Sequence, residues 1–220
     1  FVISPSRIFT TELYDRFKIS SYYIPNPIDQ HLIEEKPEPK GDGSVIFIGR
    51  LEYEKGAHLL LQLAKILKSV KIHVCGGGSL QKLFLNCKLQ NIFYHGFVTG
   101  DDKTNFIKRS SIVIVPSIVQ EMFSYTVSEA LALGKPVVAF DLGGPKEQIE
   151  ASGGGLLAKP FDIKYFAENV MYLIENPLEA KRMGLRGRKW VEEKLHPDQY
   201  AKKLAKVYEN SIKSSADTYN

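Results

Sequence analysis

SIVIVPSIVQEMFSYTVSEALALGKPVVAF, residues 111 to 140, has two short apolar runs on either side of a segment with helical periodicity. The runs at 111–116 and 136–140 have the β-branched bias of buried strands in a parallel sheet. Between them, residues 124–133 are predicted to form a helix, which follows a loop. The stretch therefore predicts a strand, a loop, a helix and another strand, the order from which parallel α/β sheets are built.

The same alternation of apolar strands and longer helical segments continues on both sides of this stretch. Right-handed crossovers would place the helices on both faces of an open, Rossmann-like parallel sheet. Ligands are then expected at the carboxyl ends of the strands. The other predicted strands are VIFI (45–48), KIHVC (71–75), NIFYH (91–95) and GGLLA (154–158). The other predicted helices cover residues 57–69, 101–109, 163–175, 180–195 and 197–212.

The first forty residues differ from the rest of the chain. FVIS and SYYIP are predicted strands, RIFTTELYDRF is a predicted helix, and EEKPEPKGDG is a charged linker with two prolines. This segment has too little apolar surface to fold alone. Because the chain also begins with Phe, we expect it to be part of a longer polypeptide.

Composition excludes several classes of protein. The chain has 220 residues, of which 44% are apolar and 25% charged, as in an ordinary soluble domain. It has no apolar run approaching about eighteen residues and no secretion signal, so a cytoplasmic protein is expected. A net charge of +4 without an aromatic and basic stripe does not indicate nucleic-acid binding. Cys75 and Cys87 are expected to be buried or inert thiols rather than a disulfide.

Two carboxylates bracket the predicted start of the helix at Ser124. Glu121 lies in the preceding loop, and Glu129 lies more than one turn into the helix. A helix N-terminus attracts anions, and carboxylates accept hydrogen bonds from sugar hydroxyls. The pair therefore suits a ligand with a phosphate in its middle and hydroxyl groups at both ends. The alternative is that Glu121 caps the helix and Glu129 faces water.

A second polar loop follows the strand VIFI. Gly49 and Arg50 come directly after this strand, and Lys55 lies at the mouth of the next predicted helix. An arginine fork and a mobile lysine could together neutralise a diphosphate without a metal. The alternative is that both are surface cations paired with Glu52 and Glu54.

Other candidate motifs are weak. In HVCGGGSLQKL, Gly76 and Gly78 fit a dinucleotide-binding fingerprint but Gln81 occupies its third position, so the glycines are expected to form a tight turn. His73 and His95 are expected to be strand residues with satisfied hydrogen bonds. No spacing of His, Cys, Asp or Glu indicates a metal site.

Several motifs, taken in order, resemble the retaining, nucleotide-sugar-dependent glycosyltransferases of the two-domain GT-B architecture, glycosyltransferase family 4. The motifs are FIGRLEYEKG, GFVTGDD followed by SIVIVPS, the Glu121 and Glu129 pair continuing into EALALGKPVVAFDLGGPKE, and GGGLLAKPFD. The resemblance covers nearly the whole chain. It departs at Ser124, where the family often has Gly, and this leaves the identity of the sugar open.

The resemblance implies a role for each site residue. Arg50 and Lys55, beside Gly49, would hold the donor diphosphate, Glu129 the ribose hydroxyls and Glu121 the transferred sugar. The loop of Gly96, Phe97 and Val98 would border the base. Backbone N–H groups of Phe123, Ser124, Tyr125 and Thr126 would face the sugar and phosphates.

The resemblance also implies a division of the chain and an activity. Residues 1–40 would be the tail of an N-terminal acceptor domain with the interdomain linker, 41–196 the donor-binding domain, and 197–220 a C-terminal crossover helix and tail. The complete enzyme would transfer a hexose, such as mannose or glucose, from a UDP- or GDP-sugar to a hydroxyl with retention, without metal or cofactor. Residues 1–220 alone are expected to be inactive, because a glycan or lipid-linked acceptor would bind the other domain.

Two other functional classes remain open. A non-enzymatic nucleotide-sugar binding module could use the same residues, and so could an epimerase or phosphorylase of similar architecture. A membrane contact is a further possibility, since a cluster of cations precedes the last helix, although a solvated helix face explains it as well. These cations are Lys181, Arg182, Arg186, Arg188 and Lys189.

Overall fold

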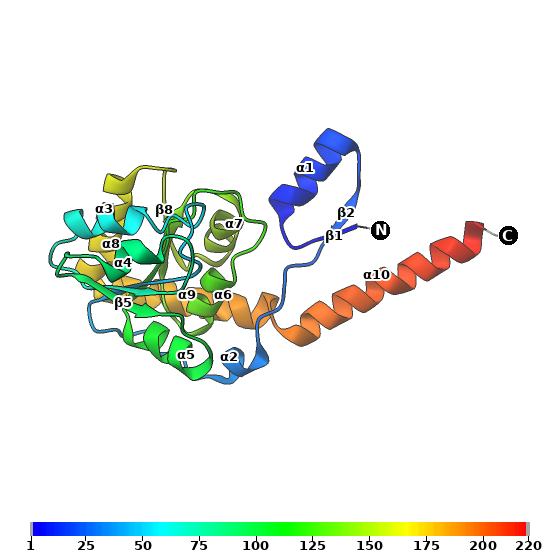
Figure 1. Cartoon of the computed structure of the whole chain (residues 1–220). Coiled ribbons are helices and arrows are strands. Elements are labelled where there is room, and N and C mark those ends of the chain that lie inside the picture. The colour runs from blue at the N-terminus through cyan, green and yellow to red at the C-terminus, as the bar shows by residue number, and fades with distance from the viewer. Residues whose placement is uncertain (1, 219–220) are drawn as a thin grey trace.

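The computed structural model describes residues 2–218, and its centre is a parallel sheet of six strands (Figure 1). The strand order is β5-β4-β3-β6-β7-β8, so the first strand of the sheet, β3, lies beside the fourth, β6. The chain therefore builds one half of the sheet, returns to the centre and builds the other half in the opposite direction. The strands are β3 (Val45–Ile48), β4 (Ile72–Cys75), β5 (Ile92–Gly96), β6 (Ile112–Val115), β7 (Val137–Phe140) and β8 (Gly155–Ala158).

Alternate residues of the central strands enter two separate cores. Val45 and Phe47 of β3 face one core, whereas Ile46 and Ile48 face the other. The first core is covered by α3 (Leu59–Ile66), α4 (Gln81–Leu85) and α8 (Ile163–Glu175). The second is covered by α5 (Gly100–Arg109), α6 (Tyr125–Ala132), α7 (Gly143–Ser152) and the end of α9 (Pro177–Lys194). Both faces of the sheet are buried, which explains the uninterrupted apolar strands.

This architecture confirms the predicted fold class, an open parallel sheet with helices on both faces. Each strand predicted after residue 44 is present, and α8 has the predicted bounds. Two helices were not predicted: α2 (Gln30–Glu34) and α7. The first has only five residues, and α7 begins with Gly-Gly-Pro, a sequence of low helix propensity.

Residues 2–23, here called the N-terminal segment, form a small unit beside the sheet. In it β1 (Val2–Ser4) and β2 (Ser21–Tyr23) pair in parallel and are joined by α1 (Arg7–Phe17), as predicted. Figure 1 shows this unit next to α7, while α10 (Pro197–Thr218) extends away from the sheet. The segment exposes several large apolar side chains, namely Val2, Ile3, Tyr14, Phe17, Ile19 and Tyr22. Phe1 and residues 219–220 lie outside the described residues.

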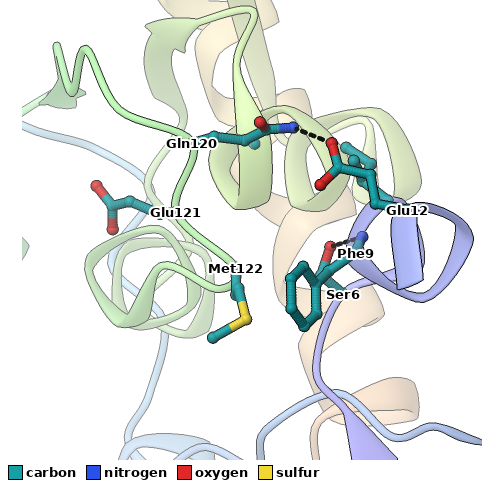
Figure 2. A pocket seen from close by; sticks show the side chains of 8 residues that line it. Ser6, Phe9, Glu12, Gln120, Glu121 and Met122 are labelled. Carbon is teal, nitrogen blue, oxygen red and sulfur yellow. Dashed lines mark hydrogen bonds between the residues drawn. The ribbon is translucent and has the colours of Figure 1, made fainter. Parts of the chain in front are cut away.

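A cavity of about 150 Å³ lies between the N-terminal segment and the loop that follows β6 (Figure 2). We call it the α1 cavity, because Ser6, Phe9 and Glu12 form its wall on that helix. The opposite wall includes Gln120 and Met122. The two halves of this cavity are far apart in the sequence, so it depends on how the segment docks.

The linker after the N-terminal segment is fixed to the body of the domain by a buried arginine. Arg188 is only 7% exposed, and its guanidinium donates to the carbonyl oxygens of Leu32, Ile33 and Ala132. The expectation that Arg188 belongs to an exposed basic face is therefore wrong. The charge pattern of α9 does not show which of its faces packs against α2 and α6. Of the described helices, none is both long and apolar enough to cross a bilayer.

A buried lysine anchors the other end of the linker. Lys135 is fully buried, and its Nζ donates to the carbonyl oxygen of Lys40 at 2.9 Å. Burial lowers the pKa of Lys135 to about 8, although the charges of Glu38 and Asp42 oppose this shift. Since the unfolded chain binds this proton more tightly, Lys135 makes the folded state less stable below pH 8 than at high pH.

We predict that Lys135→Met will remove a component of stability that increases with pH. Between pH 8 and 10.5 the wild-type chain should gain unfolding free energy relative to the variant, because only unfolded Lys135 remains protonated there. The gain should reach at most about 1.4 kcal/mol per pH unit. Urea unfolding across this range measures it, with Lys68→Met on the surface as the control. Parallel pH profiles for wild type and Lys135→Met would contradict the prediction.

Candidate functional site

The candidate site lies where the two halves of the sheet meet. Because β3 and β6 are neighbours, the loops that follow them diverge above their carboxyl ends, the usual ligand position in such sheets. The loop after β3 carries Gly49, Arg50 and Lys55, and the loop after β6 carries Glu121 and Phe123. The structure therefore brings together the two polar loops that the sequence singled out separately.

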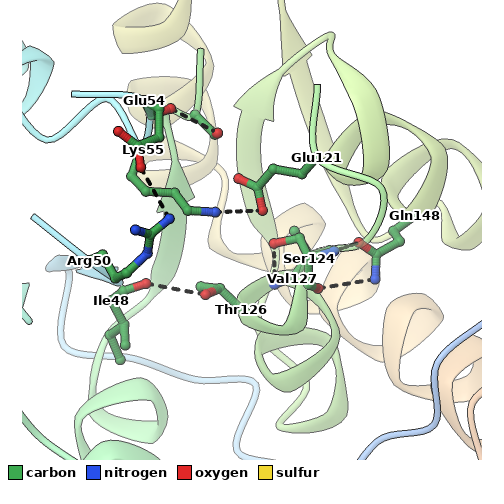
Figure 3. Close-up of polar contacts among 10 residues, drawn as sticks. Ile48, Arg50, Glu54, Lys55, Glu121, Ser124, Thr126, Val127 and Gln148 are labelled. Atoms are coloured by element: carbon green, nitrogen blue, oxygen red, sulfur yellow. Dashed lines mark hydrogen bonds and ion pairs between the residues drawn. The ribbon is translucent and has the colours of Figure 1, made fainter. Parts of the chain in front are cut away.

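Each predicted carboxylate is held by a lysine. Lys55 Nζ lies 2.8 Å from Glu121, and Lys103 Nζ donates to Glu129 at 2.6 Å (Figure 3 shows the first pair). The two glutamate side chains are only 12% and 17% exposed, respectively. The alternative that Glu129 simply faces water is therefore wrong. The attraction between opposite charges at these distances, in largely buried surroundings, holds both carboxylates in place.

The cations of the first loop have different partners. Arg50 forms an ion pair with Glu54 at 3.1 Å and keeps a largely exposed side chain. Lys55 crosses to Glu121 in the other half of the sheet rather than pairing with Glu52 or Glu54. The surface-pair alternative is thus correct for Arg50 and wrong for Lys55.

The N-terminus of α6 lies between these charged groups. Ser124 is the N-cap, and its side chain accepts from the N–H of Val127. Thr126 Oγ1 donates to the carbonyl oxygen of Ile48, which ties the first turn of the helix to the end of β3. The N–H groups of a first helical turn have no partner within the helix, so those of Tyr125 and Thr126 are available to an anion.

Helix α7 supports this arrangement from behind. The N–H of Gly144 donates to the carbonyl oxygen of Glu121, and a methyl group at Gly144 would lie only 2.8 Å from the backbone of Phe123. Gly143 has a φ of +56°, and a methyl group there would lie only 2.7 Å from the carbonyl oxygen of Glu121. These glycines were not among the predicted site residues. Their signal is a Gly-Gly pair that follows a predicted strand after two residues, Asp141 and Leu142.

A cavity of about 360 Å³ opens on one side of α6, and we call it the Lys103 cavity. Gly76 and Gly77 form part of its floor, and the N–H of Gly76 donates to the carbonyl oxygen of Gly96. Gly76 has a φ of +147°, which agrees with the predicted tight turn. Lys103 borders the cavity but was not predicted as a site residue. Predicted site residues that line it are Gly49, Arg50, Phe97, Val98 and Thr126.

A second, small cavity of about 40 Å³ adjoins the Lys103 cavity, and both are lined by Ile48, Gly49 and Thr126. Lys55, Glu121, Ser124 and Thr126 line it, and we call it the Lys55 cavity. Glu121 therefore lines the Lys55 cavity, whereas Glu129 is connected to the Lys103 cavity only through its ion pair with Lys103. Tyr125 is half exposed and meets Phe123 edge to face near this point.

The cysteines and the two strand histidines, His73 and His95, form no part of the Lys55–Glu121 and Lys103–Glu129 ion pairs. Cys75 and Cys87 are free thiols, and burial raises the pKa of Cys75 to about 12. His73 and His95 lie in adjacent strands and share a hydrogen bond of 2.8 Å, so their predicted structural role is confirmed. Among the described residues, no group of three or more His, Cys, Asp or Glu could hold a metal ion.

Residues 29–190 match the family described as Glycosyl transferases group 1. The chain belongs to this family. The match includes every strand of the six-stranded sheet and both polar loops, so it covers the whole candidate site. The resemblance drawn from the sequence motifs is therefore confirmed.

Curated relatives are glycosyltransferases of differing substrate. The chain is 30% identical to an uncharacterized glycosyltransferase of Methanocaldococcus jannaschii, covering 74% of this chain and 44% of that protein. It is 23% identical to the O-antigen chain mannosyltransferase C of Escherichia coli, covering 97% and 61%, respectively. The chain thus spans about half the length of the curated relatives it matches.

Solved structures share the fold of this chain. Staphylococcus aureus TarM, whose complex contains UDP, matches 94% of this chain and 43% of its own, with a TM-score of 0.80 and 23% identity. Anabaena HepE in complex with UDP-glucose matches 96% and 64%, with a TM-score of 0.82 and 20% identity. These similarities confirm that the described domain is one half of the GT-B architecture.

We predict that Gln148→Met will destabilise this glycosyltransferase domain by about 1 to 3 kcal/mol. Buried Gln148 on α7 accepts from the N–H of Ser124 at 2.9 Å and donates to Ser128 Oγ at 2.7 Å. Methionine has a similar length but cannot replace either bond, so buried polar groups at the start of α6 would be left unpaired. Urea unfolding measures the loss, with Gln62→Met on the exposed side of α3 as the control. Equal unfolding free energies for both variants would contradict this role of Gln148.

Proposed function

We propose that residues 41–196 bind the nucleotide-sugar donor of a retaining glycosyltransferase. The complete polypeptide would then transfer a hexose from this donor to a hydroxyl of a glycan or lipid-linked acceptor. The observation that carries the proposal is the order of groups across the start of α6. Glu121 with Lys55 comes before the first turn of α6 along the chain, and Glu129 with Lys103 comes after it. UDP in the TarM complex and UDP-glucose in the HepE complex support a nucleotide-sugar ligand.

The donor is proposed to bind across both cavities. The nucleoside would occupy the Lys103 cavity, with its base beside the loop of Gly96 to Val98 and its ribose hydroxyls at Glu129. The diphosphate would lie over the first turn of α6, within reach of Arg50 and Lys55. The sugar would then lie on the side of Glu121. A volume of about 360 Å³ in the first cavity is within the range of small-ligand sites.

Lys55 can serve the diphosphate without releasing Glu121. A lysine ammonium has three N–H donors, so Lys55 can donate to a phosphate oxygen and to the carboxylate together. Arg50 must exchange Glu54 for the phosphate, and such an exposed pair is worth little, so the exchange costs about 1 kcal/mol or less. Binding would therefore leave the ion pair across the two halves of the sheet in place.

Departure of the diphosphate is the step that requires stabilisation. The bond between the anomeric carbon and the phosphate oxygen breaks, and negative charge develops on that oxygen. Arg50, Lys55 and the N–H groups of Tyr125 and Thr126 supply positive charge there, a contribution that can reach several kcal/mol. These groups make a metal or other cofactor unnecessary in the proposed reaction. The acceptor hydroxyl bonds to the same face of the anomeric carbon and gives its proton to the departing phosphate, so Glu121 is not needed as a base.

The proposed domain boundaries follow the same assignment. Residues 1–40 would belong to the acceptor side and the connection, and residues 197–220 to a helix that returns toward it. The paired β1 and β2, with their exposed apolar side chains, support the idea that this segment completes another unit. Direct binding measurements distinguish UDP from GDP donors, and mannose from glucose.

We predict that at least one UDP-, GDP- or ADP-sugar will stabilise the chain against heat. A donor at about one hundred times its dissociation constant should add about 2.7 kcal/mol. Lys55→Met should reduce the stabilisation by the nucleoside diphosphate far more than that by the nucleoside, because the lost contact is to phosphate. Lys65→Met, on the exposed side of α3, should change neither. The proposed function fails if none of these donors shifts the melting temperature of the wild-type chain.

The two carboxylates should have separable effects on affinity. Glu129→Gln should weaken binding of every ligand with the ribose, including the nucleoside diphosphate, by about 1 to 3 kcal/mol. Glu121→Gln should leave nucleoside diphosphate affinity nearly intact and weaken only the nucleotide sugar. Isothermal calorimetry measures the affinities for both ligands, with Glu168→Gln on the exposed side of α8 as the control. Equal losses for both ligands in Glu121→Gln would mean that the carboxylates bind the opposite ends of the donor.

A further inference from the structure

Glu147, on α7, is a half-buried carboxylate outside the donor site. Its side chain accepts hydrogen bonds from Ser6 Oγ at 2.9 Å, from the N–H of Arg7 at 2.8 Å and from the N–H of Ile8 at 3.4 Å. All three donors belong to the start of α1, about 140 residues earlier in the chain. A carboxylate at this position satisfies N–H groups that have no partner within the helix and also complements the helix dipole.

The same carboxylate also lies close to β2. Burial raises the pKa of Tyr23, the charge of Glu147 raises it further, and Arg7 opposes both effects. The guanidinium of Arg7 lies over the Tyr23 ring at 4.4 Å from its centroid. Glu147 therefore interacts with both the start of α1 and strand β2 of the N-terminal segment.

Helix α7 connects Glu147 rigidly to the donor site. One turn before Glu147, Gly143 and Gly144 pack without a gap against the backbone of Glu121 and Phe123. A helical turn has a fixed rise, so a group held by Glu147 has a fixed position relative to Glu121. Among the described residues, the hydrogen bonds of the Glu147 side chain run to the N-terminal segment.

Two of the residues that Glu147 holds, Ser6 and Ile8, line the α1 cavity. Figure 2 shows Phe9 of α1 facing Met122 across this space, while the Glu121 carboxylate points away from α1 toward the side of Lys55. The other polar link across the cavity is long, from Gln120 Nε2 to Glu12 at 3.4 Å. The bonds to Glu147 are more numerous, and those from Ser6 and Arg7 are shorter, at 2.9 and 2.8 Å, so they dominate the docking of α1.

We propose that Glu147 is a positioning residue that latches the N-terminal segment to the donor domain and sets the width of the α1 cavity. The inference rests on the proposed function in one respect, that this cavity borders the sugar and the incoming acceptor hydroxyl. The latch fixes Phe9 and Glu12 opposite the loop of Gln120 to Met122 without touching the donor. Its loss should affect the acceptor side of the reaction and spare donor binding.

Hydrogen exchange of the 220-residue chain tests the latch directly. Glu147→Gln keeps the shape but loses the charge and one strong acceptor, so amides in residues 6–9 should exchange at least roughly tenfold faster. Glu147→Asp keeps the charge and should restore part of the protection. Glu150→Gln, three residues further along α7 and exposed, is the matched control and should exchange as the wild type does. Unchanged exchange at residues 6–9 in Glu147→Gln would overturn the proposal.

Binding and turnover separate a latch from a general structural role. In Glu147→Gln, nucleoside diphosphate affinity should stay within about twofold of wild type, and exchange in α6 should not change. In the complete polypeptide, the KM for acceptor should rise while the KM for donor stays constant. Loss of donor affinity together with faster exchange throughout the sheet would overturn the latch. If no nucleotide sugar binds the wild-type chain, the proposed function fails, and the exchange at residues 6–9 still decides the latch.

Discussion

The site depends on the close approach of two backbones, the loop after β6 and the first turn of α7. Gly143 and Gly144 leave no space for a side chain, so the peptide of Glu121 lies directly on the helix. One turn later Gln148 bonds both backbone groups of Ser124, the N-cap of α6. One helix thus fixes the Glu121 loop and the N-terminus of α6 together. Displacing α7 would separate the carboxylate from the anion-binding turn that it must work beside.

The charges of the site are paired before any ligand binds. Lys55 links the loop after β3 to the loop after β6, and Lys103 links α5 to α6. Ion pairs with such largely buried carboxylates resist reorientation, because separating the two partners leaves a buried charge without a partner. The proposed donor, with negative charge at its centre and hydroxyl groups at its ends, can use the lysines and carboxylates without breaking them apart. Preorganisation of this kind favours a transition state in which negative charge grows on the phosphate.

Local sequence patterns predicted the sheet and the polar loops but not the contacts that assemble them. The β-branched runs at 45–48 and 111–116 follow from burial on both faces, a property that each strand shows in its own residues. The helix α7 was not predicted, since Gly-Gly-Pro is a poor helix start and its stability comes from packing on β7, β8 and α9. Arg188 looked like a surface cation because the charge pattern of α9 does not show that this side chain packs against α2 and α6. Partners such as Lys103 for Glu129 depend on where two distant elements meet, which no local period encodes.

The spacing of Glu121 and Glu129 now has a physical explanation. Eight residues across a helix start place one carboxylate in the loop and the other more than one turn inside the helix, with the first turn of α6 between them along the chain. A closer pair on the helix alone would share a face and a cavity. The wider spacing gives the two carboxylates different partners, Lys55 from the loop after β3 and Lys103 from α5. In the proposed function, the donor must therefore be long enough to reach both ion pairs and charged where it crosses α6, and those two demands together exclude a simple sugar or a simple phosphate.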